Sequence, residues 1–102
     1  MFTYLKCRWI HEHIEEPICL YSELSENRWE KRKVEIYRDG SMAPASEDFE
    51  CGDTLLGGEA IPVLPEIASD PQFEPSDITA EEFEKVWAQA TTNPRWPLTK
   101  IG

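Results

Sequence analysis

The chain has 102 residues and a formal net charge of −10, enough for one domain with a hydrophobic core and too little for two. The negative charge excludes direct binding to nucleic acid or to an anionic membrane by simple electrostatic attraction. Because no run of about 20 apolar residues is present, we expect a soluble, cytoplasmic protein, in which the well-separated Cys7, Cys19 and Cys51 stay reduced.

The charge is unevenly distributed along the chain. Residues 1–38 hold seven acids and seven bases, whereas residues 39–102 hold thirteen acids and three bases. No Lys or Arg occurs between Asp39 and Glu84. Such a surface favours a basic protein partner through long-range steering, and an acidic surface that serves solubility alone is the alternative interpretation.

Three segments, residues 2–10, 18–24 and 29–37, alternate apolar and polar side chains as half-buried strands do. Asp39-Gly40 then supplies the backbone of a tight hairpin turn. Residues 41–46 contain Pro44, which cannot donate a ladder hydrogen bond, so a fourth strand there should lie at an edge. The side expected to face the core carries Leu5, Trp9, Ile18, Leu20, Leu24, Val34 and Ile36.

A helix is predicted from residue 79 onward. Thr79 is an N-cap with Glu82 three residues later, and Ile78 and Phe83 occupy the positions of a hydrophobic staple. The apolar stripe expected to pack on the sheet consists of Phe83, Val86, Trp87 and Ala90. Residues 62–68 can form a second, short helix with Pro65 in its first turn.

These elements predict an α+β two-layer sandwich. An antiparallel meander of three to four strands is packed on one face by the C-terminal helix, with room for the second short helix. A single domain is expected over residues 1–92. Residues 93–102 are then a C-terminal tail, either loosely ordered or a strap in which Trp96 docks.

The other face of the predicted sheet is left open. Cross-strand pairs of charges and tyrosines account for such a face without a function, and a binding face is the alternative. The side chains expected there are Tyr4, Lys6, Arg8, Tyr21, Glu23, Lys31, Lys33, Glu35 and Tyr37. A small ligand-binding protein or enzyme would use Tyr4, Arg8, Tyr21, Lys33 and Tyr37.

Residues 47–65 have no consistent period and predict a long loop, a kind of segment that often carries function. Its start holds the carboxylates of Glu47, Asp48, Glu50 and Asp53. Their spacing does not match a calcium-binding loop, so we expect a solvated acidic surface that binds a partner.

No catalytic motif is present: the sequence lacks a glycine-rich phosphate loop, a Cys-x-x-Cys pair and a His-Glu-x-x-His helix. His11 and His13 alternate on an extended backbone, but two imidazoles do not complete a metal site. We therefore predict no catalytic residues, no metal and no cofactor.

Several blocks occur together in the chain. They are Trp9-x-His11, EPxxLYSE at residues 16–23, RKVEIYxDG at 32–40, LPxxxxDPxF at 64–73 and ITxEEFExxW at 78–87. In these blocks the chain resembles, over about residues 3–90, a small bacterial family catalogued only as a domain of unknown function. The resemblance implies no activity and no functional residue.

Small acidic proteins of this kind resemble immunity proteins for bacterial toxins. Our functional hypothesis is a non-enzymatic protein-binding module, an immunity-type inhibitor that places Glu47, Asp48, Glu50 and Asp53 on a basic toxin surface.

Overall fold

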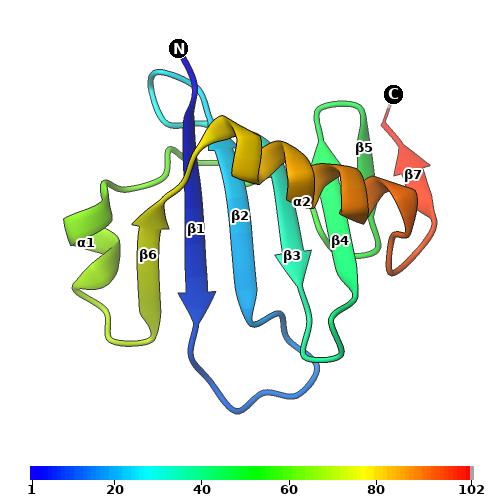
Figure 1. The fold of residues 1–102 in the computed structure, drawn as a ribbon, viewed down its shortest axis with the longest axis horizontal. Helices are drawn as coiled ribbons and strands as arrows, with labels where there is room; N and C mark the ends of the chain where they lie inside the picture. Colours follow the sequence, from blue (N-terminus) through cyan, green and yellow to red (C-terminus); the bar gives the residue numbers. More distant parts are fainter. Residues whose placement is uncertain (102) are drawn as a thin grey trace.

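An antiparallel five-stranded sheet with the order β4-β3-β2-β1-β6 forms the centre of the molecule (Figure 1). The structure is a computed structural model and describes residues 1–101. The strands are β1 (Thr3–Trp9), β2 (Cys19–Leu24), β3 (Glu30–Ile36), β4 (Met42–Ser46), β5 (Phe49–Cys51), β6 (Phe73–Asp77) and β7 (Leu98–Lys100). The helices are α1 (Leu64–Ala68) and α2 (Ala80–Thr92).

The meander of β1 to β4 confirms the strands predicted from alternation. The turn between β3 and β4 is closed by Gly40, whose φ of 85° lies in the left-handed region that glycine adopts at little cost. Its backbone N–H donates to the carbonyl of Tyr37 at 2.9 Å. Pro44 lies in β4, which ends the five-stranded sheet on this side, as a proline requires.

The sheet has more strands than the sequence pattern indicates. Asp70-Pro71 and Glu74-Pro75 are typical of a turn region, but Phe73–Asp77 forms β6, which pairs with β1 at the other edge. Pro75 is tolerated there because an edge strand donates on one side only. A second, two-stranded sheet pairs β5 with β7, so the loop predicted over 47–65 contains a short strand at its start.

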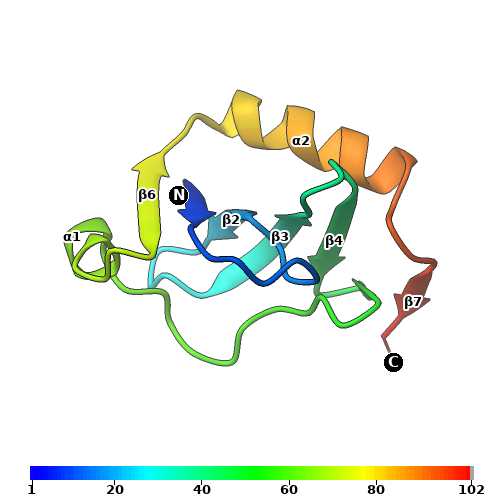
Figure 2. The same ribbon diagram turned by 90° about the horizontal axis from the view of Figure 1, so that it is seen from below.

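Both faces of the sheet are covered, which the two-layer prediction did not include. Helix α2 crosses one face, and the chain between β5 and α1 passes beneath the other (Figure 2). That chain is tied to the sheet: Thr54 donates to Glu35 at 2.5 Å, and the backbone N–H of Gly57 donates to Glu30 at 2.7 Å. The molecule is therefore layered as helix, sheet and loop.

The two helices form where their local signals predict. Thr79 and Glu82 make a complete capping box at the start of α2, and a proline lies in the first turn of α1. Phe83 and Ala90 are the buried residues of α2. No helix within residues 1–101 is long and apolar enough to cross a bilayer.

The segment after α2 packs back onto the molecule. Trp96 meets Tyr37 edge-on, with ring centroids 5.6 Å apart, and lies against the buried Ala43 and Cys51. Arg95 pairs with Asp39 at 3.2 Å. Trp96 therefore docks as the strap interpretation expects, and β7 follows it; Gly102 lies outside the described residues.

Candidate functional site

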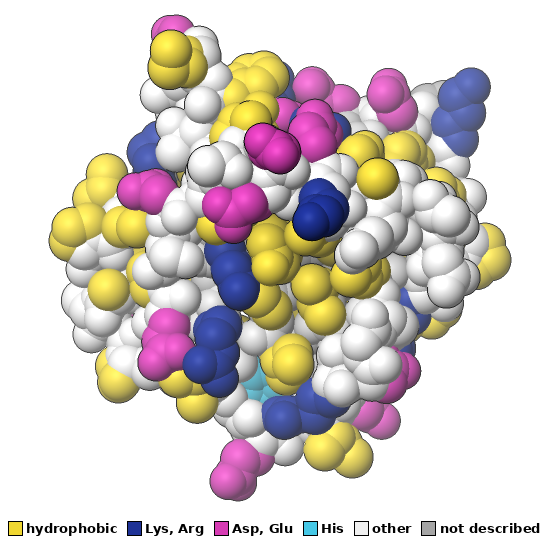
Figure 3. All heavy atoms as spheres, in the orientation of Figure 1, with side chains coloured by type: hydrophobic (Ala, Val, Ile, Leu, Met, Phe, Trp, Pro, Cys, Tyr) yellow, Lys and Arg dark blue, Asp and Glu magenta, His cyan; other side chains and the backbone are white. Residues whose placement is uncertain are grey.

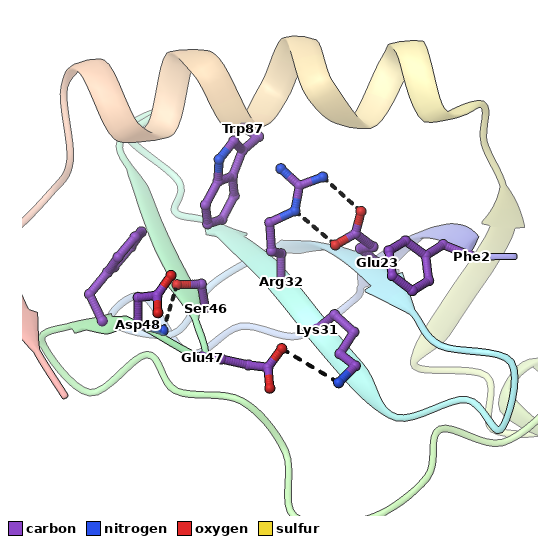
Figure 4. Close-up of a pocket in the computed structure, with 9 residues that line it drawn as sticks. Phe2, Glu23, Lys31, Arg32, Ser46, Glu47, Asp48 and Trp87 are labelled. Atoms are coloured by element: carbon purple, nitrogen blue, oxygen red, sulfur yellow. Dashed lines mark hydrogen bonds and ion pairs between the residues drawn. The ribbon is translucent and has the colours of Figure 1, made fainter. Parts of the chain in front are cut away.

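A cleft of about 580 Å³ opens between α2, the edge of β3 and β4, and the turn that leads into β5 (Figure 4). We call it the acidic cleft. It is lined by Phe2, Glu23, Lys31, Arg32, Ser46, Glu47, Asp48, Phe49 and Trp87. Two of the four carboxylates predicted to bind a partner, Glu47 and Asp48, are therefore part of it.

The wall of the cleft is a row of residues that lie opposite one another on adjacent strands. Tyr4 is opposite Glu23, Glu23 is opposite Arg32, and Arg32 is opposite Ser46. Directly opposite residues project to the same face of a sheet. Because α2 crosses the sheet over this row, Glu23 and Ser46 are buried, whereas Arg32 stays partly exposed at the cleft.

Arg32 is the centre of that row. Its guanidinium donates to Glu23 at 2.8 and 2.7 Å and to Glu84 of α2 at 2.7 and 3.0 Å. It also lies over the rings of Phe83 and Trp87, at 4.9 and 5.0 Å. The hydrogen bonds to Glu23 and Glu84 raise the pKa of Arg32 above its usual value. This cation is thus already matched by two carboxylates and is not available to a partner.

Aromatic rings form the apolar part of the cleft. Trp87 is stacked between Phe83 and Phe49, with centroid distances of 6.2 and 5.8 Å. Figure 4 shows Trp87 descending from α2 beside Arg32, and Phe2 lies on the far side of the ion pair. Phe83, Phe49 and Arg32 already lie against the half-buried indole, which lines the cleft together with Phe49 and supplies its apolar surface.

The mouth of the cleft is acidic. Glu47 and Asp48 are both exposed, and Glu47 makes one long ion pair of 3.4 Å with Lys31. The Ser46 hydroxyl holds the turn by accepting the backbone N–H of Asp48 at 3.0 Å. Within residues 1–101, the Asp48 carboxylate has no Lys or Arg partner. It is an exposed acceptor at the mouth and is available to a cation.

Glu50 and Asp53 are placed elsewhere. Glu50 lies in β5 opposite Thr99 of β7, and Asp53 follows β5 at its other end. Asp53 lines a separate polar pocket with Arg95 and Trp96. The four predicted carboxylates are therefore divided, with only Glu47 and Asp48 at the acidic cleft.

The open face predicted from the sequence is also divided. It combines Tyr4, Arg8, Tyr21, Lys33 and Tyr37, and two of these, Lys33 and Tyr37, come from β3 and its end. Tyr4 lies opposite Glu23, which lies opposite Arg32, and the Arg32 side chain contacts α2. Tyr21 is two residues from Glu23, and Arg8 is four residues from Tyr4. Tyr4, Arg8 and Tyr21 are therefore on the face that α2 crosses. Lys33 lies opposite Ser22 on the other face, and Tyr37 is buried beside Trp96. The expectation of one shared surface was wrong.

On the α2 side, many Asp and Glu side chains lie at the end of the sheet that the helix crosses (Figure 3). Several Lys and Arg side chains lie over the part that α2 leaves uncovered. There Lys6 lies 5.7 Å from the ring of Tyr21, and Arg8 pairs with Glu74 at 3.1 Å. These contacts satisfy the uncovered basic residues within the sheet itself.

The ring of His11 is used internally. Its Nε2 hydrogen-bonds the carbonyl of Pro17 at 2.8 Å, and its Nδ1 accepts the backbone N–H of His13 at 2.9 Å. With both ring nitrogens hydrogen-bonded within the protein, His11 has no nitrogen left for a metal. Across residues 1–101, no group of three or more His, Cys, Asp or Glu residues is arranged to hold a metal ion.

Comparison with protein families assigns the chain to one family. It belongs to the family described as "Domain of unknown function (DUF6881)", whose match covers residues 3–92. No curated protein and no solved structure gives a match to the chain.

The sequence pattern missed the aromatic and basic parts of the cleft. Phe49, Arg32 and Trp87 come from segments far apart in the chain and meet only through tertiary packing. Trp87 was assigned to the helix stripe and is half-buried there. No local sequence pattern indicates that these three side chains come together.

Proposed function

We propose that this protein is a non-enzymatic protein-binding module, an immunity-type inhibitor that covers the basic surface of a bacterial toxin. The observation that carries the proposal is the acidic cleft, where the unmatched carboxylate of Asp48 lies at the mouth of an aromatic-walled hollow. The family match gives no activity that would support or oppose this proposal.

The cleft has the chemistry to hold an arginine or lysine side chain of the partner. A guanidinium or ammonium group at the mouth can donate to a carboxylate such as that of Asp48. The apolar stem of the partner side chain would lie along Phe49. Arginine anchors seated in well-packed pockets supply much of the affinity of protein interfaces.

The overall charge supports the same partner. The chain carries a net charge of −10, and the stretch without Lys or Arg between residues 39 and 84 includes both mouth carboxylates. Enzymes that degrade nucleic acids need basic clefts, and carboxylates can occupy the positions that phosphates would take. Three unpaired cysteines agree with an inhibitor that acts in a reducing cytoplasm.

Capture of partners from the native host tests the proposal. The bait proteins are the wild type, the cleft variant Glu47→Gln/Asp48→Asn and a control variant Glu12→Gln/Glu15→Gln. The control removes the same charge from exposed residues in the loop between β1 and β2, away from the acidic cleft.

We expect a basic protein in the wild-type and control captures, and roughly tenfold less of it with the cleft variant, as for the loss of one or two interfacial charge contacts. A basic partner captured equally by all three proteins would show that the acidic cleft is not the binding site. A partner with an acidic surface would contradict the proposed class of function.

A further inference from the structure

A second cavity, of about 450 Å³, lies on the face of the sheet opposite α2. The chain between β5 and α1 passes below this face, and α1 lies beside β6 at its edge (Figure 2). The apolar lining of the cavity includes Leu5, Leu20, Ile67 and Phe73. Its charged lining residues are Glu30, Lys33, Glu66 and Asp70. Its volume falls within the roughly 300–1,000 Å³ of small-molecule sites.

The cavity is held open by fixed contacts. We call the chain between β5 and α1 the covering loop. Arg28 anchors one part of it, because its guanidinium donates to the carbonyls of Ile61 and Pro62 at 2.7 Å each. At Gly57 the backbone N–H donates to Glu30, and a Cβ there would lie 3.0 Å from the same carboxylate. Arg28 has a φ of 68°, a left-handed conformation that a non-glycine residue adopts only when its surroundings hold it. The loop is thus fastened around the cavity by contacts within the protein.

The deep charges of the cavity cancel. Glu30 has a side chain only 4% exposed and pairs with Lys33 at 3.2 Å. Its carboxylate also accepts from the Ser22 hydroxyl at 3.0 Å and from the Gly57 N–H at 2.7 Å. The pair therefore presents a neutral, hydrogen-bonded wall rather than a free charge.

The charges at the rim do not cancel. Glu66 lies in α1 and Asp70 lies two residues beyond the end of this helix, and both line the cavity. The Asp70 carboxylate accepts the backbone N–H of Gln72 at 3.0 Å. Neither carboxylate pairs with a Lys or Arg anywhere in residues 1–101. The cavity is apolar inside and negative at its rim.

We infer that this cavity binds a small organic amine, an ammonium group on an apolar body. The body fits among Leu5, Leu20 and Phe73, which removes apolar surface from water. The ammonium group lies at the rim, where Glu66 and Asp70 attract it. An organic anion of the same size would meet these two unpaired carboxylates at the rim and is disfavoured. This site is independent of the acidic cleft, which lies on the other face.

Three probes of equal apolar body separate the contributions of body and charge. They are 3-phenylpropylamine, 3-phenylpropanol and 4-phenylbutyrate, each titrated into the ¹⁵N-labelled protein at neutral pH while amide chemical shifts are recorded. We expect the amine to shift the amides of Leu20, Ile67 and Phe73, and the carboxylate to bind roughly tenfold more weakly or not at all. Equal binding of amine and carboxylate, or no shift with any probe, would overturn the inference.

Two variants locate the charge. Glu66→Gln/Asp70→Asn should weaken the amine roughly tenfold and leave the alcohol unchanged; the amide oxygen that this variant places at position 70 can still accept the backbone N–H of Gln72. The cleft variant Glu47→Gln/Asp48→Asn has the same change in net charge and should leave amine binding unchanged. If the cleft variant no longer binds the amine and Glu66→Gln/Asp70→Asn still binds it, the inference is wrong. This outcome does not depend on whether the protein binds the proposed basic partner.

Discussion

Glu23 and Arg32 lie directly opposite each other on β2 and β3, and their side chains are joined by two hydrogen bonds of 2.8 and 2.7 Å. The carboxylate of Glu23 is 6% exposed and the guanidinium of Arg32 is 21% exposed. Arg32 continues to Glu84, so one cation links two strands and the helix above them. The position of α2, and with it the wall of the acidic cleft, depends on this chain of charges.

Removal of Arg32 should strongly destabilise the protein. Arg32→Met leaves the buried Glu23 carboxylate without its cation, at a cost of about 3–5 kcal/mol in the free energy of unfolding. Urea unfolding measures the loss. Lys31→Met, next in the chain but part of the exposed pair with Glu47, is the control and should change stability by about 0.5 kcal/mol or less.

The double variant Glu23→Gln/Arg32→Met tests the cause. Because the buried charge is gone, it should be more stable than Arg32→Met alone. A double variant as unstable as the sum of the two single changes would show that Arg32 acts through packing on Phe83 and Trp87 instead.

Acid should weaken the link between α2 and the sheet. Hydrogen bonding to Arg32 lowers the pKa of Glu84 below its ordinary value of 4.5. A carboxylate with a lowered folded-state pKa stabilises the fold above the unfolded-state pKa and loses that contribution as the pH falls through the folded-state pKa. The Glu84 side chain is 52% exposed, so the contribution should stay below about 1 kcal/mol.

The comparison is between wild type and Glu84→Gln, with unfolding measured from pH 7 down to pH values below 4.5. The variant should be the less stable at pH 7, and the difference should vanish in acid. Glu59→Gln, an exposed carboxylate in the covering loop, is the matched control and should show no such convergence. A constant difference across the pH range would argue against the Arg32 contact.

The capping box at the start of α2 gives a small and selective effect. The Thr79 hydroxyl accepts the backbone N–H of Glu82 at 3.1 Å. Thr79→Ala should therefore cost about 1 kcal/mol, and Thr79→Ser much less, because serine keeps the acceptor. Equal losses in thermal unfolding for both variants would be inconsistent with a capping role of the hydroxyl.

The three cysteines should differ in reactivity. All are free thiols, with Cys7 and Cys51 buried and Cys19 partly exposed. Burial raises the pKa of both Cys7 and Cys19, which keeps the reactive thiolate scarce near neutral pH. A thiol reagent followed by peptide mass spectrometry should label Cys19 first in the folded protein and all three after unfolding without reductant. Recovery of a single free thiol would contradict the structure.

Local signals in the sequence were sufficient for much of the fold. The alternation in β1 to β3, the Asp39-Gly40 turn and the capping box at Thr79 each involve residues close in the chain, and each predicted its element. Strand β6 was not predicted, because Pro75 and its charged neighbours disfavour a strand when the segment is considered alone. Only pairing with β1 makes an edge strand there.

The relative orientation of the strands could not be predicted in the same way. Alternation shows which residues of one strand share a face, but not which face of the next strand they join. In the register of the sheet Leu5 lies opposite Ser22, and Ser22 lies opposite Lys33. Leu5 and Val34 are therefore on opposite faces, although both are apolar and buried. Each face has its own cover, so apolar residues are needed on both.

The candidate site was predictable only in part. Glu47 and Asp48 stood out because a cluster of acids in an irregular loop is visible in the sequence. Their aromatic neighbours Phe49 and Trp87 meet through tertiary packing between a short strand and a helix. The separation of Asp53 from the same cluster follows from β5, which the sequence pattern did not indicate.

The association rate with a captured basic partner tests the proposed function most directly. It should be measured by stopped flow as salt rises, since the Debye length falls from about 10 Å at 0.1 M to about 3 Å at 1 M. Wild type is compared with Glu47→Gln/Asp48→Asn and with Glu50→Gln/Asp53→Asn, which has the same net charge but an unaltered acidic cleft.

If Glu47 and Asp48 guide and hold a basic side chain, the wild-type association rate should fall steeply with salt. At low salt the cleft variant should associate roughly tenfold more slowly, and the Glu50/Asp53 variant should stay close to wild type. Association that is insensitive to salt and equal in all three proteins would contradict the proposal that this protein binds a basic partner through its acidic cleft.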